Sequence, residues 1–229
     1  MRLVVSAIRM VFLDIGGVLY DDRVYARAWR KALREAGADF SDDEFDAEYV
    51  ACRAAQDGSF RRRLADRFVG PDTDVDQLAK VAARYWDYPP SSVQADAAPT
   101  LEQLRDAGYR LGLIANQPSD VRNALRRDGL GAYFDTWAIS DDLGLHKPDP
   151  ALFVEALRVA RVEPHAAAMV GDRLDYDIRP ANEAGMHTVW LLRGEAPDDP
   201  TQEQLAEPDV SIHDLAELPL ALGTLGART

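Results

Sequence analysis

The sequence predicts an α/β protein with a Rossmann-like parallel sheet core and an inserted all-helical cap domain. From about Pro99 onward, short apolar runs alternate with amphipathic segments of helical period, which is the pattern of βαβ units around a parallel sheet. Residues 22–90 instead contain only segments of helical period, separated by glycine and proline breaks. We therefore expect residues 1–21 and 91–229 to form the α/β core and residues 22–90 to form the helical cap.

The individual elements follow from the same patterns. Short apolar runs predict strands at Met10–Leu13, Arg110–Ala115, Thr136–Ile139, Ala167–Val170 and Thr188–Leu191. Amphipathic segments predict core helices near Leu101–Ala107, Ser119–Arg127, Pro150–Ala160 and Asp177–Ala184, and cap helices near Val24–Ala36, Ser41–Ala55, Phe60–Val69 and Val75–Trp86. A proline- and acid-rich stretch near Glu195–Glu207 predicts a surface loop, which precedes a last short strand and helix near Asp209–Leu222.

The composition narrows the class of protein. Of 229 residues, 47% are apolar and 28% are charged, which predicts a soluble globular protein with one large domain or one domain plus a smaller insert. The formal net charge of −13 argues against bulk attraction to nucleic acid or to an anionic membrane, because like charges repel. We therefore expect neither as a partner, and an anionic substrate requires a local site.

Two further features bear on location. Cys52 is the single cysteine, so no intramolecular disulfide is possible and a reducing cytoplasm is expected. The apolar stretch Leu3–Ile8 is broken by Arg9 and is too short for a membrane span, and it lacks a clear cleavage signal. It predicts either an extra strand or a loose leader, and the chain is expected to be cytoplasmic.

Three predicted strands end in a polar residue. Asp14, Asn116 and Asp172 each follow an apolar run directly, and ligands of open parallel sheets bind outside the carboxyl ends of the strands. Taken singly, such a residue is usually a turn former or a helix cap. The neighbours favour a site, because Gly16-Gly17 follows Asp14 and further aspartates follow Asp172.

The carboxylates predict a metal site. Clustered carboxylates repel one another unless a cation lies among them, and Mg²⁺ prefers hard oxygen ligands and shares phosphate oxygens. Lys147, in the run Gly144–Pro150, adds a point charge presented by a proline-rich loop. The negative charges of Asp14, Asp172 and Asp177 are balanced by Mg²⁺ with Lys147, so the site is roughly neutral before a phosphate arrives.

Four motifs now carry a family resemblance. The chain resembles the haloacid dehalogenase-like (HAD) hydrolase superfamily, in particular members with a helical (C1-type) cap after the first motif. The matching segments, over nearly the whole chain, are Asp14-Ile15-Gly16-Gly17-Val18-Leu19, Leu113-Ile114-Ala115-Asn116, Lys147-Pro148-Asp149-Pro150, and Gly171-Asp172 with Asp177 and Ala184-Gly185-Met186.

The resemblance implies a Mg²⁺-dependent phosphatase acting on a small phosphorylated metabolite. Asp14 would be the nucleophile that forms an aspartyl-phosphate, with Lys147 as the other catalytic residue. Asn116, Gly17 and Lys147 would bind the phosphoryl group. The metal would be held by Asp14, the backbone carbonyl of Gly16, Asp172 and Asp177, of which the last would hold a metal-bound water or Lys147. Asp175 is expected to be a solvated residue at a helix start.

Two departures put the rate in doubt. Phosphatases of this family usually carry a second Asp, which protonates the leaving group, at the position that is Gly16 here; such help is typically worth ~10²–10⁴-fold. His146 is the nearest titratable substitute by sequence. The family's motif II Ser or Thr is Ala115, and a lost hydrogen bond to a charged group costs ~1.5–3 kcal/mol. An alternative is therefore a weakened member that binds a phosphorylated ligand or a protein partner without efficient turnover.

Other activities of the superfamily fit less well. Dehalogenases place an aromatic residue where this chain has Gly16, and phosphonate-cleaving relatives need a cap lysine, whereas Lys31 and Lys80 are predicted on solvent faces. The cap is expected to select the substrate, with Arg53 and Arg61–Arg63 as candidates for an anionic group, although pairing with nearby acids is the commoner role of such arginines. Trp29, Phe45 and Cys52 are expected in the cap core. The oligomeric state is not encoded in any feature we recognise.

Overall fold

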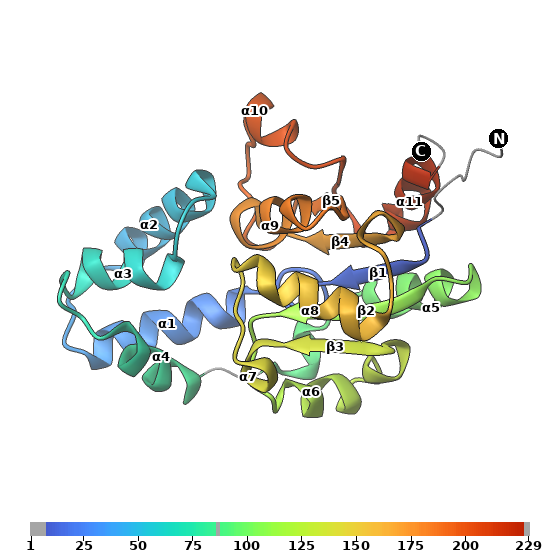
Figure 1. Ribbon diagram of the computed structural model, residues 1–229. Coiled ribbons are helices and arrows are strands. Elements are labelled where there is room, and N and C mark those ends of the chain that lie inside the picture. Colours follow the sequence, from blue (N-terminus) through green and yellow to red (C-terminus); the bar gives the residue numbers. More distant parts are fainter. Residues whose placement is uncertain (1–7, 86–87, 227–229) are drawn as a thin grey trace, which may run out of the picture.

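One six-stranded parallel sheet forms the centre of the protein (Figure 1). The computed structural model describes residues 8–85 and 88–226. The strands are β1 (Met10–Leu13), β2 (Arg110–Ala115), β3 (Thr136–Ile139), β4 (Ala167–Gly171), β5 (His187–Leu191) and β6 (Val210–Ile212), in the order β3-β2-β1-β4-β5-β6. All neighbouring strands pair in parallel. The bounds of β1 to β5 agree with those of the five predicted strands to within one residue. The predicted α/β fold class is confirmed.

Helices cover both faces of the sheet because the strand side chains alternate. Met10 and Phe12 of β1 pack into one apolar cluster, and Val11 and Leu13 pack into the other. The first cluster is covered by α8 (Pro150–Ala160) and α9 (Arg179–Glu183), and the second by α5 (Ala97–Asp106), α6 (Val121–Arg127) and α11 (Leu218–Gly226). Strands buried on both faces read as nearly continuous apolar runs, which is why they were recognisable in the sequence.

The described part of residues 22–90, the helical insert, carries four helices, which lie beyond one end of the strands (Figure 1). These helices are α1 (Arg23–Glu35), α2 (Asp42–Ala55), α3 (Phe60–Phe68) and α4 (Val75–Ala83). Ser41, Ser59 and Asp74 cap the last three, each accepting a hydrogen bond from a backbone N–H three residues on. The insert has its own apolar cluster, in which the predicted core residues Trp29, Phe45 and Cys52 are all buried. The division into two domains stays a prediction.

Several short elements were not predicted. They are α7 (Ser140–Leu143), α10 (Gln202–Leu205), a π-helical turn at Leu174–Ile178, and 3₁₀ turns at Pro90–Ser92, Gly131–Tyr133, Pro164–Ala166 and Leu215–Glu217. The helix expected from Asp177 begins earlier, with the π-helical turn, which leads directly into α9. Such turns are frequent at functional sites.

The stretch near Glu195–Glu207 was predicted to be a surface loop, and this prediction is incomplete. It contains α10, and Ala196 is buried in an apolar cluster while its carbonyl oxygen accepts two hydrogen bonds from Arg53 of the helical insert. Composition gave no hint of this contact, since proline and acidic residues describe only local chain preference. Residues 3–7 of the predicted N-terminal element and Trp86 of the last cap helix lie outside the described residues, and Ile8 is buried in the core. None of the described helices has the length and apolarity needed to cross a membrane.

Candidate active site

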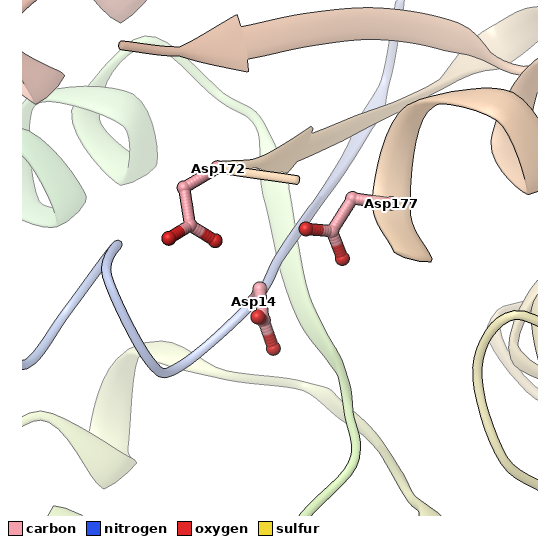
Figure 2. A group of neighbouring side chains, drawn as sticks. All are labelled: Asp14, Asp172 and Asp177. Carbon is pink, nitrogen blue, oxygen red and sulfur yellow. The ribbon is translucent and has the colours of Figure 1, made fainter. Parts of the chain in front are cut away.

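The polar residues at the strand ends converge, as predicted. Asp14 and Asp172 directly follow the neighbouring strands β1 and β4, and Asp177 comes from the π-helical turn after β4. One carboxylate oxygen of each of these three aspartates lies within 4.8 Å of the others (Figure 2). The cluster sits where the strand order changes direction along the chain, since β2 lies on one side of β1 and β4 on the other.

Lys147 joins this cluster as a buried cation. Its side chain is only 3% exposed, and its Nζ lies 2.9 Å from Asp14 Oδ1 and 2.6 Å from Asp177 Oδ1. Burial by itself lowers the pKa of a lysine, but the charges of Asp14 and Asp177 outweigh burial and raise the pKa of Lys147 above its usual value. The ammonium group is therefore charged throughout the physiological range.

Asn116 holds the loop that presents Lys147. Its Nδ2 donates to the Lys147 carbonyl oxygen at 2.8 Å, and its Oδ1 accepts from the Lys147 N–H at 2.7 Å. The sequence predicted Asn116 as a phosphate ligand, but this side chain is engaged on the backbone of Lys147. Its observed contacts are those of a positioning residue, and direct phosphate binding by Asn116 stays a prediction.

Negative charge exceeds positive charge around Asp172. Burial raises the pKa of Asp172 well above its usual value, and the charges of Asp177, Asp14 and Glu195 raise it further, while a 2.6 Å hydrogen bond from the Glu195 N–H opposes this. Burial also raises the pKa of Asp177, to about 6, against the lowering effect of Lys147. Such an excess is costly unless a cation lies among the carboxylates.

The donor set fits a hard divalent cation. Asp14 and Asp172 offer carboxylate oxygens, which Mg²⁺ prefers. Both oxygens of Asp177 already have partners, Lys147 Nζ at 2.6 Å and the Arg173 N–H at 3.1 Å, so Asp177 is better suited to holding Lys147. The Gly16 carbonyl, the remaining predicted ligand, accepts a 2.7 Å hydrogen bond from the Val18 N–H, and its role toward a metal stays a prediction.

Gly17 must be a glycine for two reasons. Its φ of +66° lies in the left-handed region, and a Cβ there would lie 2.0 Å from Asp172 Oδ2. The chain therefore turns tightly against the carboxylate cluster directly after Asp14. Phosphate binding by Gly17 stays a prediction.

A cavity of about 850 Å³ connects the strand ends to the helical insert. Asp14, Lys147 and Asp172 line it from the sheet, and Tyr25, Trp29, Phe60, Arg61 and Lys80 line it from the insert. Trp29 is thus both a core residue and part of the cavity wall. The cavity is large enough for a small metabolite.

The four candidate arginines of the insert differ. Arg53 is bonded to Ala196 and Asp198, Arg62 to Asp66, and Arg63 to Glu48. Arg61 lines the cavity and donates a 2.5 Å hydrogen bond from Nε to the Tyr25 hydroxyl, and within residues 8–85 and 88–226 no carboxylate ion pair of Arg61 is found. Lys31 and Lys80 are exposed, as predicted, but Lys80 also lines the cavity.

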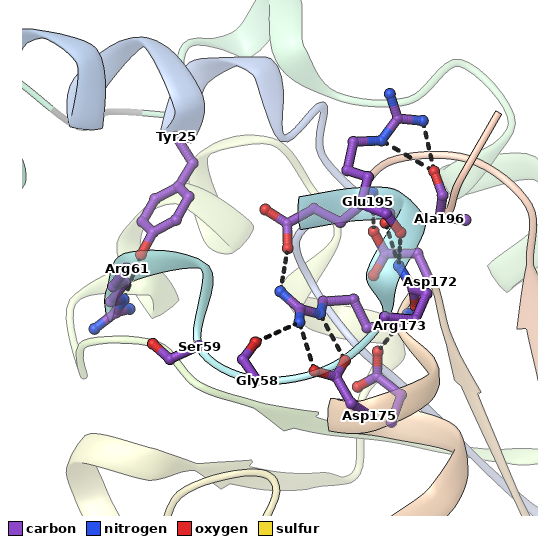
Figure 3. Close-up of polar contacts among 12 residues, drawn as sticks. Tyr25, Gly58, Ser59, Arg61, Asp172, Arg173, Asp175, Glu195 and Ala196 are labelled. Carbon is purple, nitrogen blue, oxygen red and sulfur yellow. Dashed lines mark hydrogen bonds and ion pairs between the residues drawn. The ribbon is translucent and has the colours of Figure 1, made fainter. Parts of the chain in front are cut away.

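Arg173 ties the carboxylate cluster to the insert (Figure 3). Its guanidinium forms ion pairs with Asp175 and Glu195 and donates a 3.1 Å hydrogen bond to the Gly58 carbonyl oxygen. The predicted solvated role of Asp175 is therefore wrong, since its side chain is only 10% exposed and pairs with Arg173. Arg173 is close to Asp175 in sequence, but its contacts with Glu195 and Gly58 join distant segments.

Asp22, Gln117 and Glu195 are among the polar cavity residues that the sequence did not assign to a site. Gln117 Nε2 donates to the Tyr88 hydroxyl at 3.3 Å, and its buried Oε1 has no hydrogen-bond partner among the described residues. The position of Gln117 directly after Asn116 was the one available signal. His146, the predicted substitute acid, lines the cavity but is exposed.

Two aspartates at strand ends, a third from the turn after β4 and a buried lysine define the class, an α/β protein with a site for an anionic group. The family model of the haloacid dehalogenase-like hydrolases matches residues 8–185, and the chain belongs to this family of enzymes. The predicted resemblance to this family is thereby confirmed, and the type of cap stays a prediction.

Individual relatives agree with the family. The chain is 34% identical over 223 residues to a glyceraldehyde 3-phosphate phosphatase of Methanopyrus kandleri, covering 92% of this chain and 95% of that protein. It is 33% identical over 198 residues to a phosphoserine phosphatase of Thermus thermophilus, covering 84% and 77%. A crystal structure of a HAD phosphatase from Thermococcus onnurineus superposes with a TM-score of 0.62 at 30% identity, covering 94% of this chain and 98% of that one.

Proposed function

We propose that the protein is a Mg²⁺-dependent phosphoric monoester hydrolase acting on a small phosphorylated metabolite. The observation that carries this proposal is the contact of the buried Lys147 ammonium with Asp14, at 2.9 Å, beside a second strand-end carboxylate, Asp172. The phosphatase names of the relatives support the reaction class. The single cysteine fits a cytoplasmic location.

Asp14 is the proposed nucleophile. Its carboxylate oxygen attacks phosphorus, the bond to the leaving oxygen breaks, and an aspartyl-phosphate forms that water then hydrolyses. Lys147 lies beside Asp14 and offsets the charge of the phosphoryl oxygens during both steps. Asn116 and Asp177 keep Lys147 in this place through its backbone and its ammonium group respectively.

Mg²⁺ is the proposed cofactor, because the excess of carboxylates around Asp172 needs a cation and the donors are hard oxygens. When bound, it would neutralise charge on the phosphoryl group and bring it to Asp14. Asp14 and Asp172 are the proposed side-chain ligands, and the Gly16 carbonyl is a third.

The organic part of the substrate would meet the insert side of the cavity. Arg61 offers a positive charge there without a carboxylate ion pair among the described residues, and Gln117 offers an unpartnered buried acceptor. Together they favour a substrate that carries a second anionic group and a hydroxyl or amino donor. Closure of the insert over the cavity would exclude bulk water while Asp14 attacks the ester.

The test is hydrolysis of p-nitrophenyl phosphate with and without Mg²⁺, by the wild type and by Asp14→Asn. We expect turnover that requires both the metal and Asp14, with a loss of about 10⁴-fold or more in Asp14→Asn, since the nucleophile is removed. The matched control is Asp135→Asn. The exposed Asp135 lies directly before β3, at the amino end of that strand. Binding of inorganic phosphate without any turnover of a broad panel of esters would favour the weakened, ligand-binding alternative.

A further inference from the structure

The space beside Gly16 is filled by another carboxylate. A Cβ built on Gly16 would lie 2.4 Å from Asp22 Oδ1 and 3.3 Å from Asp22 Cγ. A side chain at position 16 would therefore occupy the place that the Asp22 carboxylate holds. This is the position two residues after Asp14, where the sequence lacks a carboxylate.

The chain reaches this arrangement through a tight turn. Leu19 and Tyr20 both donate backbone hydrogen bonds to the Ile15 carbonyl oxygen, which brings the chain back on itself after Gly17. The ring of Tyr20 is buried and stacks on Tyr88 with 4.3 Å between the ring centroids. The turn is thus fixed by packing, and it returns the chain to Gly16 at residue 22.

Asp22 makes a side-chain hydrogen bond with Asp172 but does not cap a helix. It precedes α1 and would be the natural helix cap, but its side chain makes no capping hydrogen bond. The neighbouring Asp21 instead accepts hydrogen bonds from the backbone and side chain of Arg23. The Asp22 side chain faces the cavity that Asp14 and Lys147 also line.

We propose that Asp22 is a catalytic residue, the carboxyl group that exchanges a proton with the leaving oxygen and with water in place of an aspartate at position 16. This inference rests on the proposed phosphatase function. It supplies the group whose absence from motif I made efficient turnover doubtful, and it does so from a position eight residues after the nucleophile.

The proton balance of the two steps is simple. In the first step, Asp14 attacks phosphorus, the leaving oxygen takes the electron pair of the broken bond, and the Asp22 carboxyl gives that oxygen its proton. In the second step, the Asp22 carboxylate takes a proton from water as the water oxygen attacks phosphorus, and Asp14 leaves as a carboxylate with release of inorganic phosphate. Asp22 ends protonated, as it began.

The first experiment measures the rate of phenol release in a single turnover for a series of aryl phosphates from p-nitrophenyl phosphate to phenyl phosphate. p-Nitrophenol leaves readily as an anion, whereas phenol needs a proton. We expect Asp22→Asn to lower the rate by about 10²-fold or more for phenyl phosphate and by less than about 10-fold for p-nitrophenyl phosphate. Asp21→Asn is the matched control and should retain the wild-type dependence on the leaving group.

The second experiment moves the carboxylate back to position 16. Gly16 does not have the left-handed φ that excludes other residues, and the three atoms nearest to its Cβ position all belong to Asp22. The double variant Gly16→Asp/Asp22→Ala should therefore regain most of the phenyl phosphate activity that Asp22→Ala loses. Gly16→Asp alone should be impaired, since its Cβ meets the Asp22 carboxylate.

Three outcomes would overturn the assignment of Asp22. The first is an equal loss of rate for all aryl phosphates in Asp22→Asn together with weaker Mg²⁺ binding. The second is an unchanged rate in Asp22→Asn. The third is a dependence on the leaving group that is changed by His146→Ala and not by Asp22→Asn. The failure of the proposed function is a different result, namely absence of Asp14-dependent turnover by the wild type on every ester of the series. Circular dichroism of each variant separates these results from unfolding.

Discussion

The side-chain amide of Asn116 forms two hydrogen bonds with the backbone of Lys147, one to its carbonyl oxygen and one from its N–H. The end of β2 and the loop before α8 are thereby joined at the residue that contacts Asp14. Asn116, which is 31 positions away in sequence, therefore fixes the position of Lys147, the only buried lysine among the described residues.

Removal of this contact should lower turnover without abolishing the fold. In Asn116→Ala, Lys147 is no longer held in place, and a displacement of about 1 Å in a catalytic group costs on the order of 10²-fold. We expect kcat on p-nitrophenyl phosphate to fall by about 10–10²-fold. Asn123→Ala, on the exposed surface of α6, serves as the control. A loss confined to KM would instead indicate that Asn116 binds the substrate directly.

Lys147→Met should have a larger effect. It keeps the apolar stem but leaves the buried Asp177 carboxylate and the partly buried Asp14 carboxylate without their cation, and breaking a buried pair costs about 3–5 kcal/mol. We expect a loss of about 10³-fold or more in kcat/KM and a clear fall in Tm. Lys31→Met, on the exposed surface of α1, should change neither. Near-normal turnover in Lys147→Met would contradict the proposed role of the lysine.

Mg²⁺ should stabilise the folded protein. A ligand that binds only the native state at 100 times its Kd adds about 2.7 kcal/mol to the free energy of unfolding. We expect Tm to rise with MgCl₂ but not with matched NaCl, and we expect Asp172→Asn to remove most of the rise. Asp135→Asn should retain it. A rise that persists in Asp172→Asn would remove this residue from the metal site.

Arg61→Ala should change substrate choice more than chemistry. Since Arg61 faces the cavity from the insert side, we expect KM for phosphate esters with a second anionic group to rise about 10-fold. Values for p-nitrophenyl phosphate, which has no such group, should change little. Arg63→Ala, whose partner is Glu48, is the control. An equal change in KM for both substrates would show that Arg61 does not contact the organic part of the substrate.

The Asp128 carboxylate should make stability depend on pH. Hydrogen bonds from Arg127 and from the Tyr20 hydroxyl lower the pKa of Asp128. A lowered pKa gives stability that is present above the unfolded-state pKa of about 4 and is lost as pH falls through the folded-state pKa. Asp128→Asn should therefore lower the free energy of unfolding by about 1 kcal/mol at pH 7. The difference should shrink below about pH 4 in urea titrations; a constant difference would contradict this account.

The sequence by itself determined the architecture and the main chemical groups. Strands buried on both faces appear as apolar runs, and Asp14, Asn116 and Asp172 at their ends predicted the convergence that the structure has. The predicted helix Ser41–Ala55 likewise begins at Ser41, the residue that caps α2. These features depend on interactions between residues close in sequence or on strand-to-strand periodicity, which a linear pattern records.

Only the tertiary structure decided which polar atoms remain available. The Asn116 side chain is hydrogen-bonded to the backbone of Lys147. Asp175 and Glu195 form ion pairs with Arg173. The Asp22 carboxylate lies beside Gly16. Each of these pairings depends on how a turn or a distant loop folds back, and a hydrogen bond saturates after one or two partners. The missing carboxylate of motif I therefore looked like a loss in the sequence, whereas in space its place is filled by a residue from the start of the helical insert.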